Sequence, residues 1–213
     1  MLDNMLRPEF LIAAGLVILV ALPFHEFSHA LAAYRLGDST AKLQGRLTLN
    51  PIAHIDPIGA LLILVAGFGW AKPTPYNPYN LRGGHYGEAI ISAAGPLSNL
   101  VLAAAAALPF RYILATDMDV PFAVIQILHF FVSINVLLMV FNLIPLPPLD
   151  GSKVLYAVLD RETAFRVRPV LDQYGPIILL ALIFLPGFIG MPSPLGIVFE
   201  VVADPITSFL LGT

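Results

Sequence analysis

Five consecutive residues combine side chains that can bind a metal ion with one that can move a proton. They are His25-Glu26-Phe27-Ser28-His29, with the spacing H-E-x-x-H, inside an apolar run from Phe10 to Ala33. Positions i and i+4 share one face of a helix, so both imidazoles can point at one metal ion. Glu26 then lies about 100° further round the helix, close enough to act on water at that metal. This pattern is half of a hydrolytic zinc site.

The same spacing also occurs by chance in solvated helices, where it has no function. Here the surroundings argue against that interpretation. Each ionisable residue in the middle of an apolar span costs about 2.5 to 3.5 kcal/mol on insertion scales. Three such residues stand within five positions, and a bound metal ion would offset their cost.

The composition indicates a protein that crosses a membrane several times. The chain has 213 residues, of which 58% are hydrophobic and 12% are charged, more apolar surface than the core of a soluble domain needs. The net charge is −3 with 11 Lys+Arg, so there is no basic patch and we expect no nucleic-acid partner. Cysteine is absent, which excludes thiolate metal sites and disulfides.

Four stretches are apolar and long enough to be membrane segments: about 10–34, 89–111, 121–142 and 176–211. The first is longer than a signal-peptide core and contains the H-E-x-x-H pattern, so we expect it to be retained as a span. Residues 60–70 are too short to span comfortably, and a proline-rich loop follows them. A re-entrant excursion fits them better, although the sequence leaves open whether 60–70 and 195–211 cross.

The period of the pattern changes between the first two spans. Polar and apolar or small residues alternate over 42–49, which predicts a half-buried β-strand within a small membrane-associated β-hairpin or re-entrant region over about 41–78. An exposed strand edge could pair with an extended substrate segment, whereas an ordinary hairpin would have no such role. Both interpretations stay open.

These elements predict an all-α polytopic membrane protein with a three-helix catalytic core, C-terminal membrane segments and the β region, forming one membrane-embedded domain over 1–213. Cations follow the first and third spans, whereas the loop at 112–120 carries Asp117 and Asp119. The cation-rich loops are therefore expected on the cytoplasmic side. If 60–70 does not cross, the ends of the first and third spans face the same leaflet, and residues there can meet.

A catalytic zinc usually has three protein ligands and one open position. The candidates for the third ligand are His54, Asp56, Glu88, His129 and Asp150. Asp150 is preferred because a proline-rich turn holds it at the end of the third span, and Gly151 permits close backbone approach. His54 and Asp56 stay open as residues that support the ligands or gate access, and no role is assigned to His85.

Two motifs carry a resemblance to a known family. His25-Glu26-Phe27-Ser28-His29 and Asn142-Leu143-Ile144-Pro145-Leu146-Pro147-Pro148-Leu149-Asp150-Gly151 resemble the site-2 protease family of intramembrane zinc metalloproteases. Residues 50–59 and 69–73 are similar to a compact prokaryotic branch without an inserted PDZ domain. The resemblance covers about residues 20–155.

The resemblance implies a chemistry and a location. It implies that His25, His29 and Asp150 bind one zinc ion, that Glu26 is the catalytic acid and base, and that Asn142 contacts the oxyanion or the substrate. It further implies a multi-pass protein of the cell membrane that cleaves transmembrane protein substrates in regulated intramembrane proteolysis, with the zinc towards the cytoplasmic side.

Two rival functions stay open. A zinc carrier or channel could also place histidines and acids inside a membrane. However, the glutamate after the first histidine is superfluous for transport, and the spans show no symmetric pair of broken helices. A catalytically silent family member could act as a binding module. The sequence gives neither the substrate nor the oligomeric state, and the ligands prefer zinc without excluding other divalent ions.

Overall fold

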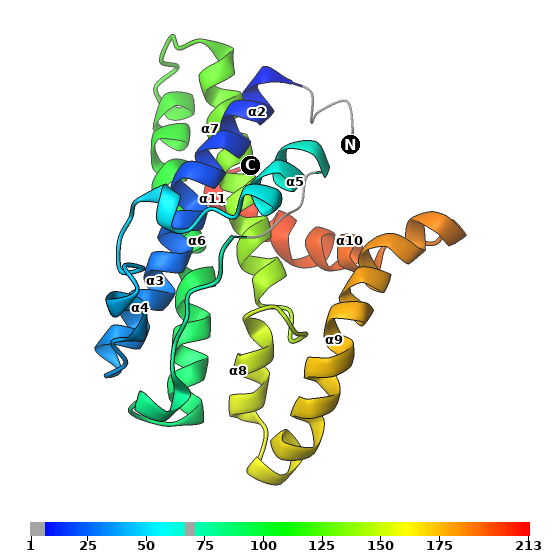
Figure 1. Ribbon diagram of the computed structural model, residues 1–213. Coiled ribbons are helices and arrows are strands. Elements are labelled where there is room, and N and C mark those ends of the chain that lie inside the picture. Colours follow the sequence, from blue (N-terminus) through cyan, green and yellow to red (C-terminus); the bar gives the residue numbers. More distant parts are fainter. Residues whose placement is uncertain (1–6, 67–70) are drawn as a thin grey trace.

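The computed structural model describes residues 7–66 and 71–213, and this part of the chain is almost wholly helical (Figure 1). Five helical stretches in it are long and apolar enough to cross a membrane: Pro8–Arg35, His85–Ala115, Phe122–Asn142, Arg161–Ile189 and Pro194–Leu211. The expected all-α polytopic class is confirmed.

The first span carries the H-E-x-x-H pattern and changes its helical pitch just before it. Helix α2 (Pro8–Leu16) passes into a π-helical turn (Val17–Ala21) and then into α3 (Leu22–Arg35). The turn precedes Pro23, which has no backbone N–H to give to the helix. Such π-helical insertions are frequent at functional sites, because they shift the register of the residues that follow.

Three spans form a bundle around the metal-binding pattern. Helix α3 packs on α6 (His85–Ala115), α6 packs on α7 (Phe122–Asn142), and α2 packs on α7 (Figure 1). The buried positions of α6 are mostly small, among them Ser92, Gly95 and Ala103. Small residues let the helix backbones approach closely within a membrane. The bundle therefore brings segments far apart in the sequence to one place.

The chain after α7 supplies a second part of the site and two further candidate spans. A proline-rich turn leads into α8 (Gly151–Val158), and the long α9 (Arg161–Ile189) follows. In Figure 1, α9 (orange) leans away from the bundle. Helix α10 (Pro194–Val198), a π-helical turn (Phe199–Ala203) and α11 (Asp204–Leu211) then form one helical stretch, and α11 packs against α6 and α7.

The strand predicted over 42–49 is wrong. Residues Thr40–Leu43 form the short helix α4, Gly45 turns the chain with a φ of +69°, and Arg46 is buried. An alternating pattern does not reveal that Gly45 takes a left-handed backbone conformation, which interrupts a regular strand. Within the described residues, the sole β pairing is one isolated antiparallel bridge between Ile55 and Ala71, so no β-hairpin is supported.

The stretch at 60–70 falls partly on helix α5 (Pro57–Ala66), which has 10 residues. A helix of that length is about 15 Å long, half of the hydrocarbon thickness of a bilayer. Helix α5 therefore does not cross a membrane by itself. Gly69 and Trp70, which contributed to the family resemblance, lie outside the described residues.

Candidate active site

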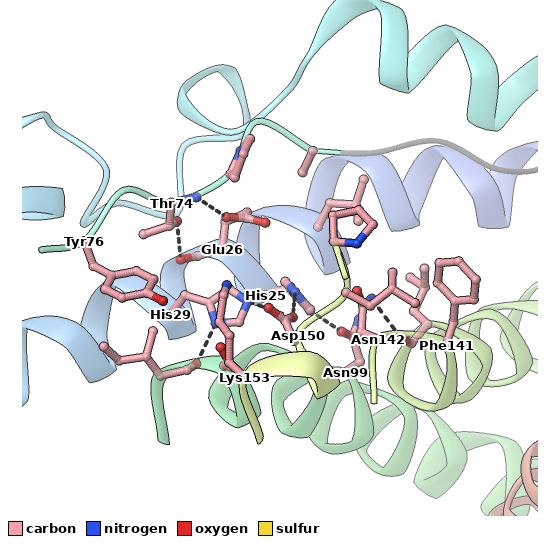
Figure 2. A pocket seen from close by; sticks show the side chains of 18 residues that line it. His25, Glu26, His29, Thr74, Tyr76, Asn99, Phe141, Asn142, Asp150 and Lys153 are labelled. Carbon is pink, nitrogen blue, oxygen red and sulfur yellow. Dashed lines mark hydrogen bonds and ion pairs between the residues drawn. The ribbon is translucent and has the colours of Figure 1, made fainter. Parts of the chain in front are cut away.

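Two histidines from one helix and one aspartate from a distant turn meet between the helices (Figure 2). The Nε2 atoms of His25 and His29 lie 3.0 Å apart. The carboxylate oxygen Oδ2 of Asp150 lies 3.3 Å from the first and 3.2 Å from the second. Both histidines are buried, and Asp150 is partly buried. The three side chains form a cluster that could hold a metal ion.

The hydrogen bonds on the far side of each imidazole decide which atoms face the cluster. The Nδ1 atom of His29 lies 2.6 Å from the carbonyl oxygen of Ile91, which can only accept a hydrogen bond. The Nδ1 atom of His25 lies 2.6 Å from the Oδ1 atom of Asn99. Both Nδ1 atoms therefore carry the proton in a neutral imidazole, and both Nε2 atoms present lone pairs.

Two nitrogen lone pairs and a carboxylate facing one another at 3.0–3.3 Å would repel unless a cation lay between them. In a tetrahedral zinc site with bonds of about 2.0–2.1 Å, two ligand atoms are about 3.3 Å apart. The chemistry of the donors and their spacing thus fit a zinc ion with three protein ligands. That set leaves a fourth position for water or substrate.

At two glycines, the absence of a side chain lets other atoms approach the backbone closely enough for the cluster to form. A Cβ atom on Gly95 of α6 would lie 2.3 Å from Nε2 of His29 and 2.6 Å from Nε2 of His25. A Cβ atom on Gly151 would lie 2.2 Å from the carbonyl oxygen of Leu143. The first glycine leaves room for the imidazoles, and the second closes the turn that presents Asp150.

Glu26 points to a neighbouring segment rather than into the three-residue cluster. The backbone N–H of Thr74 donates to Oε2 of Glu26 across 2.8 Å, and the Thr74 hydroxyl donates to the Glu26 carbonyl oxygen across 3.0 Å. Figure 2 shows Thr74 directly beside Glu26. Thr74 thus holds Glu26 beside the first histidine through two hydrogen bonds, one to the carboxylate and one to the main-chain carbonyl oxygen.

A cavity of about 370 Å³ adjoins the cluster. Its walls include Tyr76 and Thr74 from one segment, Phe141 and Asn142 from the end of α7, and Lys153 from α8. The Nζ atom of Lys153 lies 5.5 Å from the centre of the Tyr76 ring. Burial, followed by the charge of Glu88, raises the pKa of Tyr76 to about 12, so this phenol is neutral at physiological pH. A volume of this size lies at the lower end of the range of ligand-binding pockets.

The other candidate ligands have different environments. His54 is buried and donates from Nε2 to the carbonyl of Thr48, Asp56 caps the start of α5, and Glu88 pairs with Arg168 at 3.3 Å. His129 packs near Phe110 and Phe130, and His85 lies 4.1 Å from the Tyr86 ring. Of the five candidates for the third ligand, Asp150 is the one that the structure brings to His25 and His29.

Asn142 lines the cavity, but part of its amide is engaged. Its Nδ2 atom donates to the carbonyl of Leu138 across 3.0 Å, one turn earlier in α7. An amide nitrogen has two N–H groups, so a second donor stays free. This geometry permits the substrate contact that the resemblance implies.

Sequence reasoning missed Asn99 and Thr74. Asn99 is an amide residue in the mainly apolar α6 and is fully buried, so its presence inside a span was a signal that could have found it. Thr74 gave no such signal, because its contact with the Glu26 carboxylate uses the backbone N–H, which nearly every residue has.

Fold and site together define a membrane-embedded protein with a metal centre of the hydrolytic type. The model of peptidase family M50 matches residues 112–183. The chain is 39% identical over 175 residues to "Putative zinc metalloprotease YwhC" of Bacillus subtilis, and the match covers 80% of each chain.

Two relatives named "Putative zinc metalloprotease Rip2" are more distant. The one from Mycolicibacterium smegmatis is 33% identical over 79% of this chain and 65% of its own length. The one from Mycobacterium tuberculosis is 31% identical over 81% of this chain and 66% of its own length. No solved structure matches. The chain belongs to peptidase family M50, which confirms the resemblance to the site-2 proteases.

Proposed function

We propose that this protein is an intramembrane zinc metalloendopeptidase that hydrolyses peptide bonds in or near transmembrane segments of membrane proteins. One observation carries the proposal: the lone pairs of His25 and His29 and the carboxylate of Asp150 converge between apolar helices, beside Glu26 and a cavity. The family and the printed names of its relatives support zinc as the metal and peptide hydrolysis as the reaction.

In this proposal, His25, His29 and Asp150 hold one zinc ion. Zinc bound there would polarise a water molecule and the scissile carbonyl group. Glu26 accepts the proton of that water and later gives it to the leaving amine, because it lies beside the first ligand. Asn142 lines the cavity, and in this proposal its second amide N–H donates to the developing oxyanion.

The substrate and the membrane side follow from the surroundings of the site. The catalytic pattern lies in the C-terminal half of the first candidate span, so the substrate is expected to be another membrane protein, cleaved in regulated proteolysis. Cations after that span, such as Arg35 and Arg46, favour the cytoplasmic side for this end of the helix. We further propose that the chain acts as one peptidase domain in a cell membrane.

Metal content and cleavage together test the function. Wild type, Asp150→Ala and Glu26→Gln are purified in detergent without added zinc, and zinc per chain is measured. Wild type should carry about one zinc ion, Asp150→Ala should lose most of it, and Glu26→Gln should keep it. Cleavage is followed with dye-quenched casein, whose unstructured chain offers extended segments. Wild type should cleave it, and Glu26→Gln should not.

Other outcomes would exclude the proposed function. A metal-free wild type, or a Glu26→Gln variant with full activity, would contradict the site and the mechanism respectively. Zinc uptake by proteoliposomes without any cleavage would support a carrier instead.

A further inference from the structure

A short extended segment crosses the site at Glu26. We name residues 72–77 the strap. In its middle, the Thr74 backbone N–H donates to the Glu26 carboxylate across 2.8 Å and its hydroxyl donates to the Glu26 carbonyl across 3.0 Å. One residue of the strap thus binds both the side chain and the main chain of Glu26. Figure 2 shows this pair beside His25.

Two prolines of the strap determine which backbone donor faces Glu26. Thr74 stands between Pro73 and Pro75, and proline has no N–H. In the run from Pro73 to Pro75, the Thr74 N–H is therefore the one backbone donor. Proline also restricts both its own φ and the residue before it to extended conformations. This tripeptide thus presents a single backbone N–H on a stiff backbone.

Arg46 fixes the first end of the strap. This residue is 5% exposed, and its guanidinium donates to the carbonyl oxygens of Lys72, Pro73 and Ala53. Burial lowers the pKa of Arg46, while the negative charge of Glu26 acts in the opposite direction. A buried guanidinium needs hydrogen-bond partners, and here the backbone carbonyl groups supply them. These hydrogen bonds hold the carbonyl groups in place.

Asp38 fixes the other end. Its side chain is fully buried and accepts hydrogen bonds from the Asn77 backbone N–H across 2.8 Å and from Nδ2 of Asn80 across 3.0 Å. Asp38 lies three residues after Arg35, the last residue of α3, which is the helix that carries Glu26. Both ends of the strap are therefore tied by buried charges next to the catalytic helix, and Thr74 lies between them.

We propose that Thr74 is a positioning residue that orients Glu26 for proton transfer. Its N–H occupies Oε2 and leaves Oε1 to act on water, while its hydroxyl fixes the main chain of Glu26. This role rests on the proposed peptidase function. A general base must stay within hydrogen-bond reach of its proton, and a displacement of about 1 Å can cost about 100-fold in rate.

A series of substitutions at Thr74 removes its donors one at a time. Thr74→Ser keeps both donors, Thr74→Val keeps the N–H alone, and Thr74→Pro removes both. With dye-quenched casein as the probe, we expect kcat within about twofold of wild type for Ser, about 10-fold lower for Val and about 100-fold lower for Pro. KM and zinc per chain should not change.

A matched control and the split between kcat and KM separate positioning from structure. In Thr116→Val, a hydroxyl that donates to the Tyr112 carbonyl is lost at the far end of α6, and activity should be unchanged. Wild-type kcat in Thr74→Val, a change in KM alone, or higher activity would overturn the proposal, since the strap would then be dispensable, a substrate subsite or a lid. Loss of zinc in Thr74→Val would also overturn it.

Hydrogen exchange tests the contact itself without any substrate. The Thr74 amide should exchange about 10-fold faster in Glu26→Ala than in wild type. The Lys72 amide, which donates to the His54 carbonyl across 2.8 Å, should not change. Equal exchange of Thr74 in both proteins would overturn the proposal. A wild type that does not cleave casein would overturn the peptidase function, and this is evident before the Thr74 variants are compared.

Discussion

The Nδ1 atom of His25 lies 2.6 Å from Oδ1 of Asn99, and Nδ2 of Asn99 donates to Oδ1 of Asn135 across 3.1 Å. One chain of hydrogen bonds therefore joins α3, α6 and α7 and ends at an imidazole of the metal cluster. Both asparagines are fully buried. This chain fixes the tautomer of His25, so that Nε2 has its lone pair towards the metal.

Replacing Asn99 should weaken metal binding. In Asn99→Ala the Nδ1 proton of His25 loses its partner, and partners of this kind contribute about 10–100-fold to metal affinity. We expect a loss of that size, measured by competition with a zinc-binding dye. Asn135→Ala should have a smaller effect, because Asn99 still accepts from His25. Leu97→Ala on the exposed face of α6 is the control. Wild-type affinity in Asn99→Ala would contradict this role.

A methyl group at position 95 should displace the imidazoles. The Cβ atom of Gly95→Ala would lie 2.3 Å from Nε2 of His29, much closer than any ordinary contact. Zinc per chain should fall to a small fraction of the wild-type value. The matched control is Gly15→Ala in α2, where a Cβ atom meets nothing within 4 Å. Equal zinc content in the two variants would show that the bundle can relax around Gly95.

A methyl group at position 151 should open the turn that presents Asp150. In Gly151→Ala the Cβ atom would lie 2.2 Å from the carbonyl of Leu143 and 2.5 Å from that of Ile144, and backbone atoms cannot rotate away. We expect a loss of about 1–3 kcal/mol in the free energy of unfolding, measured by thermal unfolding, together with lower zinc content. Gly187→Ala in α9 has open space and should match wild type.

The buried carboxylate of Asp38 should make stability depend on pH. Burial raises the pKa of Asp38, but hydrogen bonds from Thr40, Asn80 and Asn77 outweigh that effect and hold the pKa below its usual value. The ionised form therefore stabilises the fold above the unfolded pKa of about 3.9. This contribution is lost as the pH falls through the lower folded pKa.

Thermal unfolding of Asp38→Asn across pH 3 to 7 measures that contribution. At pH 7 the variant should be less stable than wild type by about 1–2 kcal/mol, because one acceptor oxygen is replaced by a donor. The difference should shrink towards pH 3. Asp119→Asn, the same change in an exposed loop, should unfold like wild type at every pH. A difference for Asp38→Asn that is constant with pH would exclude the ionised carboxylate as its cause.

The sequence by itself determined the class of protein and the local chemistry. The apolar composition indicated a membrane protein, and apolar runs of about 20 residues favoured helical spans, which satisfy their own backbone groups in lipid. The H-E-x-x-H spacing placed two imidazoles on one face through helix geometry alone. Both inferences use interactions between residues close in the chain. The role of Asp150 as third ligand stays a prediction, now with a geometry that permits it.

Tertiary structure decided what lies next to these residues. Thr74 reaches Glu26 across 48 positions, and Asn99 reaches His25 across 74. A backbone N–H has no sequence signature, so the strap could not be read from residue types. The wrong prediction over 42–49 has the same cause. The alternating pattern predicted a strand, but the buried Arg46 side chain donates to the carbonyl group of Pro73, which is distant in the sequence. Contacts through space were stronger there than the local preference for a strand.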